Sequence, residues 1–288
     1  MIRENLKPPL KTVSVNVALA LREDIGSGDV SAALIPSDRL CEATLIARES
    51  AVLCGQAWLE EAFRQIDPAV QVQWLASEGA YVPPDAQLCR ISGPAAAVLT
   101  GERTALNFLQ LLSGVATATR RYVERVKGTS ARILDTRKTL PGLRVAQKYA
   151  VACGGGQPHR MGLYDAVMLK ENHIAVCGSI RAAVEAARAR GDGLPVIVEA
   201  EDLNQAEEAL AAAVDVLLLD NFPTHLLARA VNLGRTQRRY NRGHTLLEAS
   251  GGISLKNVRE IADTGVDRIS IGSLTKDISA IDLSLRID

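Results

Sequence analysis

Short apolar runs recur through the second part of the chain, and they constrain its fold more than any other feature. Successive runs begin 20 to 34 residues apart, and each is followed by a polar or glycine-rich loop and then by a segment with helical spacing. Runs that are apolar throughout indicate strands buried on both faces, as in parallel sheets covered by helices. The six runs are 132–134, 166–169, 196–198, 216–219, 245–247 and 269–271.

The number of runs narrows the choice of architecture. Six strands in about 160 residues are too few for a complete eight-stranded barrel. The pattern predicts an incomplete parallel α/β barrel of six to seven strands over residues 113–275. An open doubly wound sheet is the structural alternative, because it also alternates strands with helices.

The first part of the chain has a different character. Residues 13–23, 53–66 and 102–112 have helical spacing, residues 41–48 and 71–75 are strand-like, and 82–85 is a proline turn. This mixed order predicts an N-terminal α+β sandwich domain over residues 1–112. Residues 276–288 are predicted to form a C-terminal segment that returns to the N-terminal domain.

Composition limits the kinds of partner. The 33 basic and 33 acidic residues give a formal net charge of zero, so no overall field attracts nucleic acid or an anionic membrane. No segment has the roughly twenty apolar residues of a membrane helix, and residues 1–10 do not resemble a signal peptide. We therefore expect a cytoplasmic protein. The cysteines are scattered, odd in number and without metal-ligand spacing, so buried reduced thiols are expected at Cys41, Cys54, Cys89, Cys153 and Cys177.

Polar groups follow every apolar run. In a parallel barrel the carboxyl ends of all strands converge on one face, where active sites lie. Each group also has an ordinary explanation: solvated charges for the basic residues, helix N-caps for the acidic ones, and a tight turn for the glycines. Their convergence on one face favours a site. The groups are 135–138, 170–173, Glu199, 220–221, 248–252 and 272–273.

The side chains at these positions sort by charge. A cationic wall, defined here as Arg137, Lys138, His159, Arg160 and Lys170, would bind a substrate with several anionic groups. Glu199 and Asp220 form an anionic pair that suits magnesium. Backbone N–H groups can bind a phosphate after the last two strands. Those segments are Ser250-Gly251-Gly252 and Ser270-Ile271-Gly272. Walker and dinucleotide fingerprints are absent.

Several long strings resemble those of the quinolinate phosphoribosyltransferase family. The most specific is Asp135-Thr136-Arg137-Lys138-Thr139-Leu140-Pro141-Gly142-Leu143-Arg144. Similar strings in the same order include 23–29, 101–107, 154–173 and 248–253, so the resemblance runs from about residue 15 to the C-terminus. It implies that quinolinate and phosphoribosyl pyrophosphate give nicotinate mononucleotide, pyrophosphate and CO2, with Mg2+, in NAD biosynthesis.

The resemblance also implies residue roles. The cationic wall and Thr136 would bind quinolinate, and Arg103 would complete the neighbouring site of a homodimer, or of a larger homo-oligomer. The catalytic residues would be Lys138, Lys170, Glu199 and Asp220. Glu199 and Asp220 would also bind substrate through the ribose hydroxyls, stabilise the developing positive charge and serve the metal. The phosphate-binding residues would be Ser250, Gly251, Gly252, Ser270, Ile271, Gly272 and Lys276.

The chain departs from the family pattern at three places. Pro158 replaces the usual asparagine before His159, which removes a backbone donor. Ile197 replaces a frequent glutamate, and Glu201 offers a second carboxylate near Glu199. The choice of Glu199 rests on its register with Leu203 and Asp220. Lys276 replaces a frequent histidine and would hold phosphate as a point charge.

Three rival functions fit part of the pattern. A transferase acting on nicotinate would need a less complete cationic wall, because nicotinate has one carboxylate. A non-catalytic sensor of a phosphate ligand would release no CO2. A Schiff-base lyase would use Lys170, but the apolar pocket that activates such a lysine is not evident.

Overall fold

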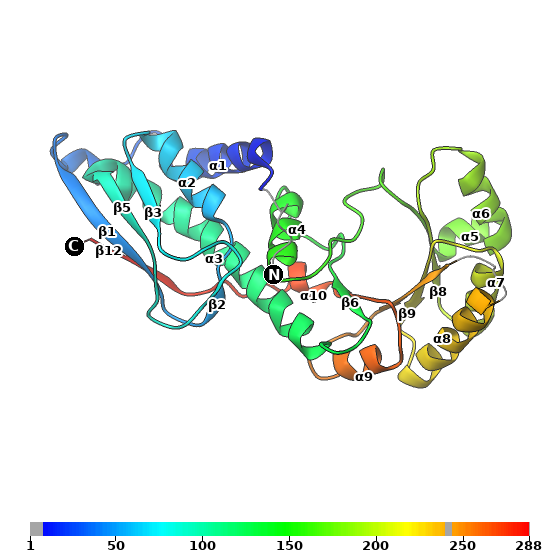
Figure 1. The fold of residues 1–288 in the computed structure, drawn as a ribbon. Coiled ribbons are helices and arrows are strands. Elements are labelled where there is room, and N and C mark those ends of the chain that lie inside the picture. Colours follow the sequence, from blue (N-terminus) through cyan, green and yellow to red (C-terminus); the bar gives the residue numbers. More distant parts are fainter. Residues whose placement is uncertain (1–7, 240–243, 288) are drawn as a thin grey trace. The chain divides into compact units, whose positions relative to one another are not determined.

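The computed structural model describes residues 8–239 and 244–287. The chain folds into two compact units that interleave in sequence. The first unit contains residues up to Arg120, Lys138–Gly155 and the segment from Ser273 onward; the second contains Arg121–Arg137 and Gly156–Gly272. Figure 1 shows the elements of both.

The first unit is built on an antiparallel sheet with strand order β12-β1-β5-β3. The strands are β12 (Leu283–Ile287), β1 (Leu40–Ala47), β5 (Gln87–Pro94) and β3 (Gln71–Trp74). Two short strands, β2 (Ala51–Val52) and β4 (Tyr81–Val82), pair separately. The C-terminal strand β12 pairs with β1 over residues 43–47 and 283–287. The expected α+β architecture is therefore present.

Helices complete this unit. They are α1 (Leu10–Ile25), η1 (Ala32–Leu34), α2 (Gln56–Ile66), α3 (Ala95–Arg125), α4 (Arg144–Cys153) and α10 (Ser273–Lys276). Trp58 and Phe63 of α2 are buried, and the Trp58 ring packs 5.6 Å from that of Tyr149. The helix expected over 102–112 is much longer, because α3 continues past residue 113 to Arg125. The apolar spacing of its two halves is continuous, and no proline or turn interrupts it.

The burial of the cysteines agrees only in part with the expectation. Cys54, Cys89 and Cys153 are buried. Cys41 is half-buried and Cys177 is exposed, so the expectation of burial is wrong for these two.

Ligand atoms of Cys54, Cys153 and Glu78 lie within 4.8 Å of one another. The Glu78 carboxylate accepts hydrogen bonds from the N–H groups of Gly55 and Gln56, at the start of α2. Burial raises the pKa of the Cys54 thiol well above its usual value, so this thiol is protonated at neutral pH.

The second unit contains a six-stranded parallel sheet with strand order β6-β11-β10-β9-β8-β7. The strands are β6 (Arg132–Leu134), β7 (Val167–Leu169), β8 (Val196–Ala200), β9 (Val216–Asp220), β10 (Leu246–Ser250) and β11 (Arg268–Ser270). All six expected strands are present. From β7 to β11 each strand lies beside the next in the chain, and β6 follows β11. A doubly wound sheet reverses its order at a switch point, so this single circuit is that of an incomplete barrel.

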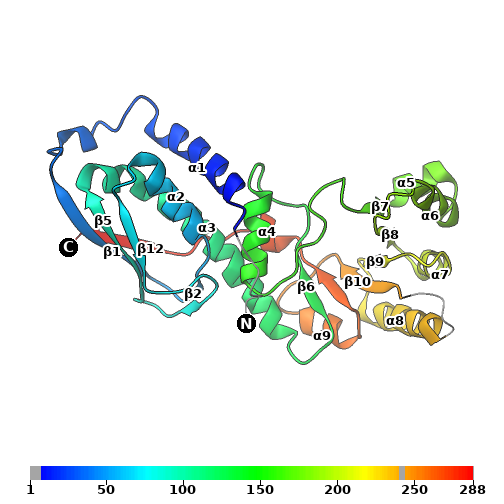
Figure 2. The same ribbon diagram turned by 45° about the horizontal axis from the view of Figure 1, so that its top comes forward.

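Helices connect the strands of this unit. They are α5 (Glu171–Cys177), α6 (Ile180–Ala189), α7 (Leu203–Ala211), α8 (Thr224–Arg239) and α9 (Val258–Asp263). Figures 1 and 2 show α6, α7 and α8 along one side of the sheet. On the other side, Ala166, Ile197, Val216 and Leu218 form an apolar cluster. Among the described residues, no helix is long and apolar enough to cross a membrane.

The register of the strands decides which side chains share a face. Glu199 on β8 and Glu248 on β10 both pair with Leu218 on β9, and Arg268 on β11 pairs with Glu248. Paired residues of neighbouring strands point to the same side. The side of the sheet that carries the apolar cluster therefore also carries two carboxylates and an arginine, at the level of Leu218.

Candidate active site

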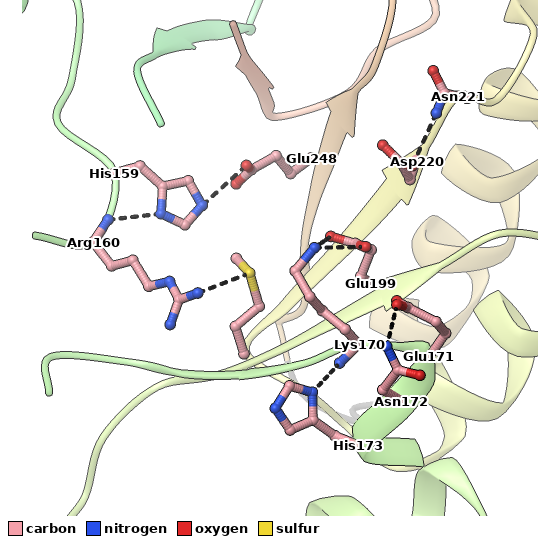
Figure 3. Close-up of polar contacts among 11 residues, drawn as sticks. His159, Arg160, Lys170, Glu171, Asn172, His173, Glu199, Asp220, Asn221 and Glu248 are labelled. Carbon is pink, nitrogen blue, oxygen red and sulfur yellow. Dashed lines mark hydrogen bonds and ion pairs between the residues drawn. The ribbon is translucent and has the colours of Figure 1, made fainter. Parts of the chain in front are cut away.

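Glu199, Asp220 and Lys170 meet the expectation of charged groups at the carboxyl ends of the strands. Glu199 and Asp220 are the penultimate and last residues of their strands, β8 and β9, rather than loop residues. Lys170 directly follows β7, and its Nζ lies 2.9 and 2.8 Å from the two carboxylate oxygens of Glu199. Figure 3 shows the lysine side chain lying across this carboxylate.

The helix-cap explanation of Glu199 does not apply. The N-cap of α7 is Asp202, whose carboxylate accepts from the N–H of Gln205. Glu201 lies beyond the end of β8 with an exposed side chain, whereas the Glu199 side chain is 14% exposed and ion-paired. The geometry favours Glu199 over Glu201, and its role stays a prediction.

Arg137 and Arg160 form the cationic centre of the second unit. Both are half-buried. Burial lowers the pKa of the Arg160 guanidinium, and the positive charge of Arg137 lowers it further, while Asp165 and Glu199 act in the opposite direction. The Nε atom of Arg137 is buried and has no hydrogen-bond partner within the part of the chain that the structure describes. Two guanidinium groups that repel each other, one with an unused donor, are suited to an anionic ligand.

His159 is more deeply buried than the other members of the cationic wall. It is 8% exposed, and its Nε2 lies 3.1 Å from Oε1 of Glu248, as Figure 3 shows. The Glu248 carboxylate also lies 3.1 Å from Nε of Arg268. Burial acts to raise the pKa of Glu248, but a hydrogen bond from His159, the charge of Arg268 and a hydrogen bond from Ser270 outweigh it, so the pKa is lowered.

The loop after β10 is fixed against the end of β9. Asn221 has a φ of 55°, its N–H donates to the carbonyl of Ser250, and its side-chain amide donates to Asp220. Gly251 has a φ of +92°, and a Cβ at this position would overlap the Asn221 side chain. Glycine is therefore needed here for both conformation and space. This contact connects the expected phosphate loop to the Asp220 carboxylate.

The second expected phosphate-binding segment, Ser270-Ile271-Gly272, has fewer groups available to a ligand than the first. The N–H of Ile271 donates to the carbonyl of Leu134, so this donor is already used within the sheet. Ser270 is 3% exposed, and its hydroxyl interacts with Glu248. Gly252, with a φ of +60° and open space beside it, and Gly272 are better placed to approach a ligand.

Three residues of the expected site belong to the first unit. Arg103 is exposed on α3. The carbonyl of Lys138 accepts from the Thr275 hydroxyl at 2.8 Å, and its side chain is exposed. Lys276 forms an ion pair with the adjacent Asp277. The second unit by itself brings together Arg137, Arg160, Lys170 and Glu199.

Three polar residues support the site but were given no role from the sequence: Asp135 and Glu248, which are buried, and Arg268, which is half-buried. Asp135, which is fully buried, accepts from the N–H of His159 at 2.8 Å. Glu248 and Arg268 hold the His159 ring from the side of the sheet. The signal was present, because each of these charged residues stands next to or inside an apolar run. Their connection to His159 required the tertiary structure. His173 orders the loop after β7, because its Nδ1 accepts from the N–H of Lys170.

The fold is an incomplete α/β barrel, and the charged cluster at the carboxyl ends of its strands is of the kind found in enzyme active sites. Family models for the N-terminal and C-terminal domains of quinolinate phosphoribosyl transferase match residues 29–113 and 115–286. The chain belongs to the quinolinate phosphoribosyl transferase family.

Individual relatives agree with this assignment. A "probable nicotinate-nucleotide pyrophosphorylase [carboxylating]" of Bacillus subtilis is 41% identical over 92% of this chain and 90% of its own. A chloroplastic nicotinate-nucleotide pyrophosphorylase of rice is 40% identical over 97% of this chain and 79% of its own. The solved nicotinate-nucleotide pyrophosphorylase of Francisella tularensis is 43% identical, covers 98% of both chains and superposes with a TM-score of 0.93.

Proposed function

We propose that this chain transfers a phosphoribosyl group from phosphoribosyl pyrophosphate to quinolinate, with decarboxylation. The products are nicotinate mononucleotide, pyrophosphate and CO2, in the biosynthesis of NAD. The observation that carries the proposal is the pair of half-buried guanidinium groups, Arg137 and Arg160, whose charges act on each other beside Lys170. An adjacent pair of carboxylates on one ring is the kind of ligand that such a cluster neutralises.

Substrate binding is the first task of these residues. Arg137 and Arg160 receive the two carboxylates, and the Lys170 ammonium adds a third positive charge. Lys170 itself is neutralised by Glu199, with which it forms an ion pair. Binding of an anionic acid at Lys170 releases the Glu199 carboxylate for a cationic partner. The arrangement orients the ring nitrogen toward the sugar, so much of the rate enhancement comes from positioning.

The chemical step needs negative charge near the sugar. As the bond to pyrophosphate breaks, the ribose carbon acquires oxocarbenium character, and the carboxylates of Glu199 and Asp220 stabilise it. The ring nitrogen then forms the new C–N bond with its own lone pair, and no base is required. The resulting pyridinium charge stabilises the electron pair left on the ring carbon when the adjacent carboxylate leaves as CO2, and a proton from water then takes the place of the carboxylate.

Magnesium fits the donor set of this site. Glu199 and Asp220 offer only carboxylate oxygens, and one oxygen of Asp220 already accepts from Asn221. Two carboxylates suit a hard cation that is held largely by substrate phosphates. Bound there, the ion would stabilise negative charge on the departing pyrophosphate.

We further propose that the enzyme is a cytoplasmic homodimer in which Arg103 completes the neighbouring site. Exposed apolar side chains on the first unit support an interface. The residues on and after α1 are Leu10, Val15, Leu19, Val30 and Leu34, which are 54 to 85% exposed. Apolar groups that gather on one surface are typical of protein contacts.

The test is incubation with quinolinate, phosphoribosyl pyrophosphate and Mg2+, with the products measured by mass and CO2 trapped. Nicotinate replaces quinolinate in a parallel reaction. We expect nicotinate mononucleotide and an equal amount of CO2 from quinolinate alone. Product from nicotinate with none from quinolinate would contradict the proposal. Chelation of Mg2+ should abolish turnover, and readdition should restore it.

A further inference from the structure

The segment Gln157–Arg160 fills the opening between the two end strands of the incomplete barrel. The N–H of Gln157 donates to the carbonyl of Ile133 on β6, at 2.8 Å, and Gln157 forms a parallel bridge with Leu134. At its other end the Arg160 guanidinium contacts the carbonyl of Ala166 at 3.4 Å and the Met168 sulfur at 3.3 Å, both at β7. The segment thus takes the place of a seventh strand, and it carries Arg160 of the cationic wall.

His159 holds this segment through both nitrogens of its ring. Nδ1 accepts from the N–H of Arg160 at 2.6 Å, so Nδ1 has no proton and Nε2 has the one proton of the neutral ring. Nε2 faces Oε1 of Glu248 at 3.1 Å. Nδ1 thus accepts from the backbone, Nε2 lies against a buried carboxylate, and 8% of the residue is exposed, so little of the ring is accessible to a substrate. The ring connects the sheet to the backbone of Arg160.

The presence of a charged side chain at position 248 requires an explanation, because the site is buried. The Glu248 side chain is completely buried, and its register neighbour on β9 is Leu218. A buried ion pair contributes little net stability compared with apolar side chains of similar volume. The position would therefore suit an apolar residue if packing were its only role. What an apolar residue lacks is an acceptor for the Nε2 proton of His159.

We propose that Glu248 is a positioning residue: held by Arg268, it fixes the His159 ring, and through the ring it fixes Arg160 for contact with a carboxylate of the substrate. This inference rests on the proposed function. In this proposal neither Glu248 nor Arg268 contacts the substrate. The His159 ring, expected from the sequence to bind quinolinate, acts instead through Arg160.

Two double variants isolate the acceptor. Arg268→Met with Glu248→Gln removes both charges but leaves an amide oxygen for the His159 Nε2 proton. Arg268→Met with Glu248→Leu removes the charges and the acceptor. The two proteins differ only in the side chain at position 248, and neither leaves an unpaired buried charge. Unfolding free energies of both are measured, so that kinetic effects are compared at known stability.

We expect the variant with Gln to keep a KM for quinolinate within about threefold of the wild-type value. The variant with Leu should raise it by about tenfold to a hundredfold, since small misplacement of a binding group has effects of this size. The KM for phosphoribosyl pyrophosphate should change less than about threefold in both. Equal effects in the two variants, or equal effects on both substrates, would overturn the proposal.

The tautomer of His159 gives a readout that does not depend on turnover. The chain has four histidines, so 15N NMR of the imidazole rings is tractable, with His159→Asn used to assign the signal. We expect the Nε2–H tautomer in the wild type and in the Gln variant, and a mixture in the Leu variant. An Nδ1–H tautomer in the wild type would overturn the proposal. A wild-type protein that has the Nε2–H tautomer but shows no activity on quinolinate would instead contradict the proposed function.

Discussion

Nζ of Lys170 lies 2.8 to 2.9 Å from both carboxylate oxygens of Glu199, so one ammonium neutralises one carboxylate at the ends of two neighbouring strands. The sequence assigns the two residues to opposite tasks, binding of an anionic acid and stabilisation of a cationic sugar. Because they contact each other directly, Glu199 occupies the position expected for the anionic acid beside Lys170, and Lys170 occupies the position expected for the cationic sugar beside Glu199. Loss of either residue therefore leaves the other charge without its ion-pair partner, and affects both binding of the acid and stabilisation of the sugar.

Replacement of Arg137 or Lys170 by alanine should lower kcat/KM for quinolinate by on the order of a hundredfold, because each loses a charge-assisted contact of about 2 to 3 kcal/mol. Steady-state kinetics with each substrate varied would measure this. Arg190→Ala is the matched control, because Arg190 pairs with Asp192 at the surface and its side chain is 65% exposed. Activity of Arg137→Ala close to that of the control would remove Arg137 from the site.

Changes at the anionic pair should affect the chemical step more than quinolinate binding. Glu199→Gln and Asp220→Asn should lower kcat by at least about tenfold with a smaller change in the KM for quinolinate, because their partners carry developing charge. Glu201→Gln is the control, since Glu201 is exposed beyond the end of β8. If Glu201→Gln is the damaging change and Glu199→Gln is silent, the assignment of the carboxylate is off by two residues.

Gly251→Ala should weaken the use of phosphoribosyl pyrophosphate. The new methyl group would overlap Asn221, which contacts Asp220, and the φ of +92° would strain any residue with a Cβ. Gly193→Ala is the control, because Gly193 has a φ of +68° and open space around its Cβ position. Both variants should lose about 1 kcal/mol of stability from the backbone. Only Gly251→Ala should raise the KM for phosphoribosyl pyrophosphate, and equal kinetics of the two would contradict the contact.

Glu248, which is buried, and Glu78, which is half-buried, should give the free energy of unfolding opposite dependences on pH. The pKa of Glu248 is lowered in the folded protein, so its contribution is present above its unfolded pKa of about 4.5 and is lost as the pH falls through the folded pKa. Burial raises the pKa of Glu78, so its contribution is present below about 4.5 and is lost as the pH rises through the folded pKa. Unfolding free energies of Glu248→Gln and Glu78→Gln, measured from pH 3 to pH 7 relative to wild type, would test this. Parallel curves for the two variants would refute it.

A shared active site should be visible by complementation. In a mixed dimer of Arg103→Ala and Lys170→Ala subunits, one site has an intact Lys170 and borrows Arg103 from its partner, whereas the other lacks both. Random reassembly of equal amounts gives about half mixed dimers, which predicts roughly a quarter of wild-type activity for isologous symmetry. Subunit exchange would be confirmed by mass. No recovery after confirmed exchange would mean that Arg103 does not serve a neighbouring site.

The sequence by itself determined the strands of the second unit and the charges at their ends. Runs such as Val216–Leu219 are apolar throughout, and only burial on both faces of a sheet accommodates them. Convergence of strand ends then follows from parallel order, which is why Lys170 and Glu199 could be placed together from the order of the strands alone. The length of α3 was underestimated, because sequence periodicity fixes the existence of a helix better than its ends.

Only the tertiary structure decided which buried groups meet. His159, Glu248 and Arg268 are far apart in the chain, and their contacts depend on strand register and on the path of the segment Gln157–Arg160 across the barrel opening. The same is true of Cys54 and Cys153, which no sequence spacing would bring together. A local pattern reports on secondary structure and on which face is buried. Contacts between distant side chains are set by packing of the whole chain, because each depends on every element that lies between them.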